Sequence, residues 1–264
     1  MLGAERNRQL RRRILERGSI RVSEEAKLFG VSDETIRRAI KLFAAEGVAD
    51  PVFGGAVLRA SSAAPGLPPV GERHRMQERA KDAIGAAAAR LVESGQTIII
   101  DAGTTTLAAA RHLRQHRGLT IITNSIPVAQ LSAEIAESVT YVIGGKLVPG
   151  SLSMIGPQAE RDLAKISADW AFIGAAAISV DSGFTSADPY EAEVKRAMIR
   201  VARRTVVVAD HTKFGARRFA SFARADDIDC LVTTSGCPEE VPPWLEAAGV
   251  TLLLCDPLPE EISA

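Results

Sequence analysis

Cysteine is scarce in this sequence of 264 residues, and its three cysteines include no CxxC pair. This odd, scattered set speaks against paired thiols and indicates reduced cysteines in a cytoplasmic protein. No apolar stretch reaches the roughly 18 residues that a membrane span needs. The charged N-terminus MLGAERNRQLRRR has no apolar core behind it, so the sequence predicts no secretory signal.

The chain also has no net charge, because its 32 basic and 32 acidic residues cancel. The overall charge therefore gives no sign of a strongly charged partner. Residues 1–60, however, hold 12 Lys/Arg against 8 Asp/Glu, and the remainder holds 20 against 24. This difference in charge suggests that the basic N-terminal part and the acidic C-terminal part have different functions. The stretch ASSAAPGLPPVG between them is typical of a linker. We therefore expect domains at 1–58 and 73–264, joined by a linker at 59–72.

The larger domain alternates short apolar runs with helical patterns. Strands are expected at 97–101, 119–123, 139–143, 170–174, 205–209, 230–233 and 250–254. Helices are expected at 73–93, 105–116, 126–137, 158–166, 189–203 and 239–248. This alternation predicts an α/β domain with a mostly parallel sheet covered on both faces.

The N-terminal domain shows the pattern of a helix-turn-helix. A first helix at 5–17 precedes two short ones joined by Gly30-Val31-Ser32, with Ser23 and Ser32 as their expected N-caps. The expected shared core comprises Ala26, Val31, Ile36 and Ile40. The third helix then offers Ser32, Thr35, Arg37, Arg38 and Lys41 to double-stranded operator DNA. Gly54-Gly55 between apolar runs predicts a hairpin, the wing of a winged helix. The alternative is a helical protein-interaction module whose charges are solvated.

The strand TIIID ends in Asp101-Ala102-Gly103 and a helix begins with Thr104-Thr105-Thr106. A helix N-terminus presents unpaired N–H groups, to which threonine hydroxyls add donors, and a glycine lets a ligand approach the backbone. Such a loop suits phosphate, while Asp101 can accept hydrogen bonds from sugar hydroxyls or hold the loop. The alternative is an ordinary turn with a threonine cap and no ligand.

Other strand ends carry polar or small residues of the same kind, at the edge where ligands of parallel sheets bind. The further effector-binding candidates are Asn124, Ser125, Gly144, Gly145, Lys195, Asp210 and Lys213. Together they suit a phosphorylated sugar or polyol. The sequence has neither a P-loop nor a GxGxxG fingerprint, so no cofactor of those types is expected.

Two further patterns have simpler explanations. His112 and His116 have the i, i+4 spacing of metal ligands, but no third ligand follows, so we expect surface residues and no metal. The run Arg11-Arg12-Arg13 is expected either to contact DNA phosphates or to form a solvated helix face.

The chain resembles DeoR-type bacterial transcriptional repressors over roughly residues 5–235. The resemblance rests on VSDETIRR and the trailing GGA, followed in order by DAGTTT, TNS, GPQAE, GFTSADPYEAEVKRAM and ADHTKFG. It implies a winged helix-turn-helix whose third helix enters the major groove. It also implies an effector domain, similar to ribose-5-phosphate isomerases, that binds a phosphorylated sugar. The expected function is therefore a repressor of sugar or polyol genes that its effector relieves, acting as a homodimer or homotetramer on a two-fold operator.

Three departures from the family pattern qualify this expectation. Ala39 replaces the usual Asp, and Asp50-Pro51-Val52-Phe53 replaces a wing with Arg and His, which predicts weaker phosphate contact. Ala175-Ala176-Ala177 stands where the related isomerases carry an Asp-rich loop, which argues against the alternative of an isomerase-like enzyme. No catalytic residue is therefore expected.

Overall fold

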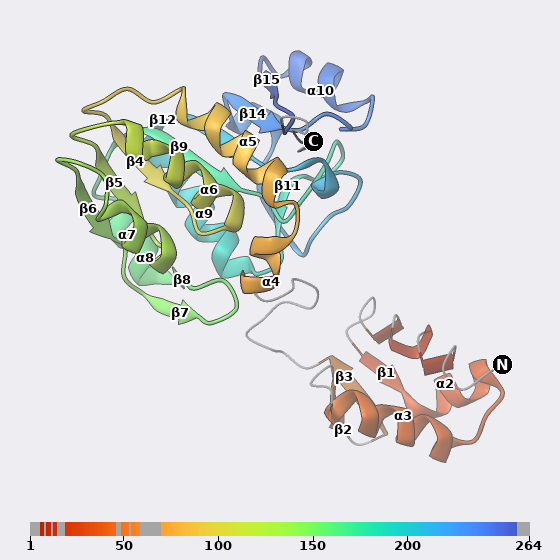
Figure 1. Cartoon of the computed structure of the whole chain (residues 1–264). Helices are drawn as coiled ribbons and strands as arrows, with labels where there is room; N and C mark the ends of the chain where they lie inside the picture. The colour runs from red at the N-terminus through yellow and green to blue at the C-terminus, as the bar shows by residue number, and fades with distance from the viewer. Residues whose placement is uncertain are drawn as a thin grey trace, which may run out of the picture. The chain divides into compact units, whose positions relative to one another are not determined.

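The structure is a computed structural model, and it describes residues 6–7, 9–11, 13–14, 19–45, 49–52, 54–58 and 70–257. The chain forms two compact units, residues 1–66 and 67–264 (Figure 1). The division falls inside the predicted linker at 59–72, of which 59–69 lie outside the described residues. The linker's bounds therefore stay a prediction.

The smaller unit has the order of a winged helix. It comprises β1 (Ser19–Arg21), α2 (Val22–Phe29), α3 (Asp33–Ala45), β2 (Ala49–Val52) and β3 (Gly55–Leu58). The strands pair antiparallel in the order β1-β3-β2, so the predicted wing hairpin is present. Ala26, Ile36 and Ile40 are buried in one core, and Val31 packs against it as expected. Gly30 ends α2 in the left-handed conformation, with φ of 63°.

The expected cap at Ser23 is wrong. Strand β1 runs directly into α2, whose N-cap is Arg21, and the Val22 N–H donates instead to the Gly54 carbonyl at 2.9 Å. A carbonyl of the wing turn thus accepts a hydrogen bond from the first N–H group of α2. Gly55 is needed there because a Cβ would lie 2.1 Å from the Ile20 carbonyl oxygen.

The larger unit is built on one parallel sheet in the order β15-β14-β12-β9-β4-β5-β6. Its strands are β4 (Thr97–Ile100), β5 (Thr120–Thr123), β6 (Val139–Val142), β9 (Ala168–Gly174), β12 (Ala202–Val208), β14 (Cys230–Thr233) and β15 (Thr251–Leu254). All six neighbouring pairs are parallel, so the expected fold class is confirmed. Each expected strand has its counterpart within three residues of the predicted bounds.

Helices cover both faces of this sheet (Figure 1). The residues Ile98 and Ile100 face a core that includes α5 (Glu78–Ala89), α6 (Thr104–His112) and α7 (Ile126–Ser132). Ile99 faces the opposite core, with α8 (Pro157–Leu163), α9 (Pro189–Val201) and α10 (Val241–Ala247). This alternation along one strand is the reason for its continuous apolar run. The described residues of this unit also form three short 3-10 turns, η1 (Leu113–Gln115), η2 (His211–Lys213) and η3 (Ala225–Asp227).

Two small antiparallel sheets were not predicted. One is the hairpin of β7 (Lys146–Val148) and β8 (Ser153–Ile155). The other joins β10 (Ala177–Ser179), β11 (Gly183–Ser186) and β13 (Ala220–Ala223). Their strands of three or four residues are too short to show a period of their own. Both matter below because they bring serines to the ends of the main strands.

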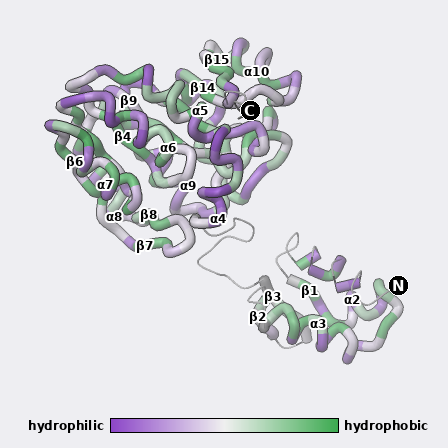
Figure 2. The backbone as a smooth tube through the Cα atoms, in the orientation of Figure 1, coloured by the Kyte–Doolittle hydropathy of each residue, from purple (hydrophilic) through white to green (hydrophobic). Residues whose placement is uncertain are grey.

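The helix predicted at 73–93 is in fact two helices, α4 (Val70–Arg75) and α5. The chain turns between them at Gln77, which has φ of 52°. The ammonium of Lys81 donates to the carbonyls of Arg73 and Met76, which this break removes from helical pairing. Figure 2 shows α4 as a hydrophilic segment.

No helix in the described part of the chain is long and apolar enough to cross a membrane. The three cysteines are free thiols, as expected. Burial, with the nearby Asp229 carboxylate, raises the pKa of the Cys230 thiol to about 12.

Candidate functional site

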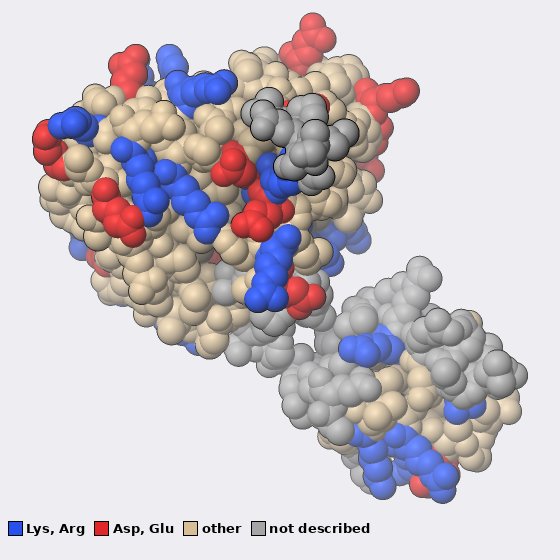
Figure 3. Space-filling view, viewed as in Figure 1, with Lys and Arg blue, Asp and Glu red and all other residues tan. Residues whose placement is uncertain are grey.

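The exposed face of α3 carries the DNA-binding candidates. The hydroxyls of Ser32 and Thr35 lie 2.9 Å apart, and the Thr35 N–H donates to Ser32 Oγ at 3.4 Å, so Ser32 caps the helix as expected. Arg37, Arg38 and Lys41 are exposed. Figure 3 shows lysine and arginine side chains gathered where Figure 1 places α3. A capped helix with exposed cations is suited to entering a major groove.

Contacts within the same unit bear on two of the sequence patterns, Ala39 and the arginine run. Ala39 is buried in the core, so the departure from the family's Asp removes no group from the exposed face. Arg13 makes a two-pronged ion pair with buried Glu25, at 2.7 and 2.9 Å. This ion pair gives Arg13 a structural role, and a DNA contact by the Arg11-Arg12-Arg13 run stays a prediction. Arg12 and the wing residue Phe53 lie outside the described residues, as does the side chain of Asp50.

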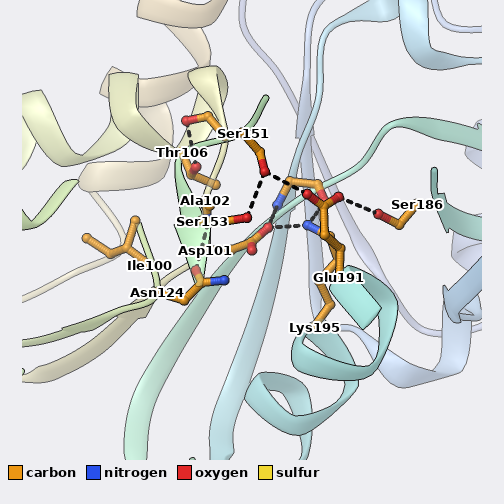
Figure 4. A network of polar contacts seen from close by, with 12 residues as sticks. Ile100, Asp101, Ala102, Thr106, Asn124, Ser151, Ser153, Ser186, Glu191 and Lys195 are labelled. Carbon is orange, nitrogen blue, oxygen red and sulfur yellow. Dashed lines mark hydrogen bonds and ion pairs between the residues drawn. The ribbon is translucent and has the colours of Figure 1, made fainter. Parts of the chain in front are cut away.

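In the larger unit, Asp101 and Lys195 form an ion pair at the strand ends (Figure 4). Asp101 is 2% exposed and Lys195 5%. Asp101 Oδ2 also accepts from the Gly174 N–H at 3.0 Å, and Lys195 Nζ donates to the Gly174 carbonyl at 2.9 Å. These contacts join the ends of β4 and β9 to α9. Of the two roles expected for Asp101, the structure shows the one that holds the loop.

Asn124 ties the next strand end to the same loop. Its side-chain oxygen accepts from the Ala102 N–H at 3.1 Å, and its amide donates to the Met154 carbonyl at 3.1 Å. Ser125 caps α7 by accepting from the Val128 N–H at 3.4 Å. Both residues are buried and lie at the strand ends, as expected, but their contacts organise the loop.

The three threonines of the loop are not equivalent. The Thr106 hydroxyl is fully buried and donates to the Gly103 carbonyl at 3.0 Å, so it shapes the loop instead of facing a ligand. Thr104 and Thr105 retain 7% and 8% exposure. Gly103 has an extended φ of 173°, which any residue adopts. Of the predicted anion cradle, the N-terminal turn of α6 with Thr104 and Thr105 is therefore the part that stays a prediction.

The glycines after β6 have local roles. A Cβ at Gly145 would lie 2.6 Å from the Ile155 carbonyl oxygen, and its φ is 146°, so glycine is needed for β8 to approach. Gly144 is exposed, and a Cβ would meet nothing within 4 Å. The structure thus gives neither glycine a contact with the buried cluster.

Glu191 and two serines complete the network, and none of the three is among the effector-binding candidates of the sequence analysis. Glu191 Oε1 accepts from Ser151 at 2.9 Å, and its other oxygen accepts from Ser186 at 3.2 Å (Figure 4). Ser151 and Ser186 come from the two unpredicted sheets or their turns. Glu193, two residues further along α9, pairs with Arg196.

A set of cations surrounds the end of β12, and two of them were not predicted. Asp210 Oδ1 accepts from the Thr212 N–H at 3.0 Å, whereas its Oδ2 is buried and has no hydrogen-bond partner among the described residues. Arg73 and Lys213 lie close enough to Lys81 to act on its ammonium as like charges. Lys81 and Thr104 line a cavity of about 640 Å³ with His74, Arg111 and Asp256.

Burial determines the electrostatics of this set. It lowers the pKa of Lys81, and the nearby Asp210 carboxylate partly reverses that effect. Burial likewise lowers the pKa of Arg73, with Glu191 as the opposing charge. Cations that are held away from water are stabilised by a bound anion.

The two histidines at metal-ligand spacing have other partners. His112 Nε2 lies 2.8 Å from Asp82 Oδ1, and His116 Nε2 lies 2.8 Å from the Val92 carbonyl. Among the described residues, no three His, Cys, Asp or Glu side chains are grouped to hold a metal ion.

Comparisons with known proteins agree with this architecture. Residues 6–62 match the DeoR-like helix-turn-helix domain, and residues 76–235 match the DeoR C terminal sensor domain. The transcriptional repressor CsqR of Escherichia coli K12 is 35% identical, over 96% of both chains. A protein of E. coli O157:H7 named for repression of the aga operon is 32% identical, over 95% of this chain and 93% of its own. The transcriptional regulator GlpR of Haloferax volcanii is 30% identical, over 96% and 98%.

Among solved structures, ribose 5-phosphate isomerase A of Methanocaldococcus jannaschii matches 52% of this chain and 55% of its own. The identity is 18% and the TM-score 0.38, so the likeness carries no conclusion about activity. The relatives that match nearly the whole length are transcriptional regulators, not enzymes. The isomerase-like alternative is therefore set aside, and the chain belongs to the DeoR family of DNA-binding transcriptional regulators.

Proposed function

We propose that this protein represses genes of sugar or polyol metabolism, and that a phosphorylated sugar or polyol bound at the strand ends of the larger unit relieves repression. The observation that carries the proposal is the buried polar cluster at the carboxyl edge of the sheet. It combines cations for a phosphate with carboxylate oxygens for hydroxyl groups. The sensor-domain family match supports a ligand-binding role for the same unit.

The orphan oxygen of Asp210 supports a hydroxyl-bearing ligand. A buried carboxylate oxygen without a donor is costly, and a sugar hydroxyl is a suitable donor. The turn that begins with Thr104 and Thr105 supplies N–H groups for the phosphate, close to the ammonium of Lys81. Lys195 is not a phosphate partner in this proposal, because Asp101 already neutralises it.

The DNA contacts are proposed for Ser32, Thr35, Arg37, Arg38 and Lys41. Two copies of the chain, or four, would place paired recognition helices on a two-fold operator in the cytoplasm. Effector binding would favour an arrangement of these helices that does not fit the operator. The relief can only equal the effector's preference between the two arrangements.

Thr105→Val tests the effector site, because the change removes a hydroxyl and keeps the shape of the side chain. The variant should bind operator DNA normally and need more sugar phosphate for release. Thr251→Val, on an exposed position of β15, is the matched control. Normal release by the Thr105 variant would remove this turn from the site.

A further inference from the structure

Lys81 occupies a fixed position beside the loop that begins α6. Helix α5 packs so closely on α6 that a Cβ at Gly85 would lie 2.6 Å from the carbonyl carbon of Ala108. Lys81 precedes Gly85 by one helical turn, and Thr104 precedes Ala108 by one turn. Both Lys81 and Thr104 line the same cavity. The ammonium is therefore held next to the anion cradle by the packing of two helices.

This ammonium also holds the end of α4. Its two hydrogen bonds go to the carbonyl of Arg73, in the last turn of that helix, and to the carbonyl of Met76, the residue after the helix. A lysine ammonium has three donors, so one donor has no acceptor among the described residues. The side chain is only 5% exposed, which limits what water can supply. A ligand oxygen would complete its coordination.

Charges of both signs act on the Lys81 ammonium. Arg73 from α4 and Lys213 from η2 act on it as like charges, and Asp210 and Glu78 act on it as opposite charges. Glu191 opposes Arg73. A phosphate monoester carries nearly two negative charges at neutral pH and offers three acceptor oxygens. It would relieve the repulsion between these cations.

We propose that Lys81 binds the phosphate of the effector while it holds the end of α4, so that occupancy of the site is transmitted to α4. The inference rests on the proposed function and adds to it a charge partner and a route of regulation. Helix α4 is the first described element after residues 59–69, through which the chain continues to the DNA-binding unit.

A bound phosphate would stabilise α4 in two ways. It supplies an acceptor for the third donor of Lys81, and it adds negative charge beside Arg73 to that of Glu191. Both effects act on the last turn of a helix of only six residues, which is marginal by itself. Phosphate binding therefore slows the opening of α4 and limits the arrangements open to the chain that precedes it.

The test uses the full chain and inorganic phosphate as the probe. Titration calorimetry measures phosphate binding, and hydrogen exchange measures the protection of the α4 amides. Lys81→Met keeps a long side chain but removes the charge. We expect phosphate to bind about 10- to 100-fold more weakly to it, the range expected for a lost charge-assisted hydrogen bond. The protection of α4 by phosphate should disappear as well.

Two further variants, one that changes a second cation and one control, also test the inference. Arg73→Gln should weaken binding less than Lys81→Met does, because Glu191 already offsets the charge of Arg73. Lys165→Met, at an exposed position, should behave as wild type. If Lys81→Met does not fold, Arg73→Gln alone must still reduce the phosphate-dependent protection of α4.

The possible outcomes separate this inference from the proposed function. Equal phosphate binding by wild type and Lys81→Met, or binding without a change in α4 exchange, would overturn the inference. Absence of phosphate binding to wild type would also overturn it. Release of operator DNA by a sugar phosphate, measured separately, would still leave the proposed function standing. Release by the unphosphorylated sugar alone would contradict the proposed function.

Discussion

Breaking the buried ion pair between Asp101 and Lys195 from one side should strongly destabilise the larger unit. Their side chains are 3% and 6% exposed, so solvent screens the pair very little. Asp101→Asn leaves an ammonium buried without its counter-charge, and Lys195→Met leaves a buried carboxylate. Breaking such a pair from one side costs about 3–5 kcal/mol. We expect each single variant to lose that much unfolding free energy.

The double variant distinguishes this reasoning from simple loss of packing. Asn at position 101 can still accept from the Gly174 N–H, and Met at position 195 is apolar, so no charge remains buried. The two changes should therefore cost less together than the sum of the singles, by about 2 kcal/mol or more. Lys165→Met removes an exposed ion pair with Asp162 and should lower the unfolding free energy by less than about 1 kcal/mol.

Urea unfolding followed by tryptophan fluorescence measures these differences. Both tryptophans of the chain, Trp170 and Trp244, lie in the larger unit, so the signal reports that unit alone. The slope of the unfolding free energy against urea concentration should be the same in all variants. Single variants that lose less than about 1 kcal/mol, or strictly additive effects, would refute the reasoning.

Three other predictions concern DNA binding by the smaller unit and helix packing in the larger one. Arg37→Gln should leave the unfolding free energy unchanged and weaken operator binding. If Arg37 contacts a base, the loss should be about 1–3 kcal/mol; if it contacts a phosphate, the slope of log affinity against log salt concentration should fall by about 1. Fluorescence anisotropy at several salt concentrations measures both quantities. Asp50→Arg should strengthen DNA binding and steepen its salt dependence, and unchanged affinity and slope would show that the wing does not approach DNA. Gly85→Ala should destabilise the larger unit by about 1–3 kcal/mol in urea, since its Cβ meets the α6 backbone; an unaffected midpoint would mean that α5 can shift.

The sequence predicted the strands of the main sheet well because each strand is an apolar run between polar turns. Ile98, Ile99 and Ile100 show the reason, since their side chains face the two cores in alternation. The order of the strands could not be predicted, because it depends on which crossovers the helices make. The contact between Asp101 and Lys195 joins residues 94 positions apart and follows from that order.

The candidate site was predicted in position but only partly in role. Asp101, Asn124 and Thr106 lie at the expected edge, yet their hydrogen bonds hold the loop. Arg73 and Lys81 were missed because they lie in a helical pattern rather than after a strand. One signal was available: Lys81 falls on the same helical face as the buried Ile84 and Gly85, where a charge needs a partner.

The central claim is tested most directly by fluorescence anisotropy of a duplex taken from the DNA that flanks this protein's own gene. The measurement is made with a panel of sugar phosphates and with the matching unphosphorylated sugars. The account predicts tight, salt-sensitive binding that one sugar phosphate relieves and its unphosphorylated counterpart does not. Binding that no sugar phosphate alters would contradict the proposed effector, and failure to bind any selected DNA would contradict the proposed contacts of α3.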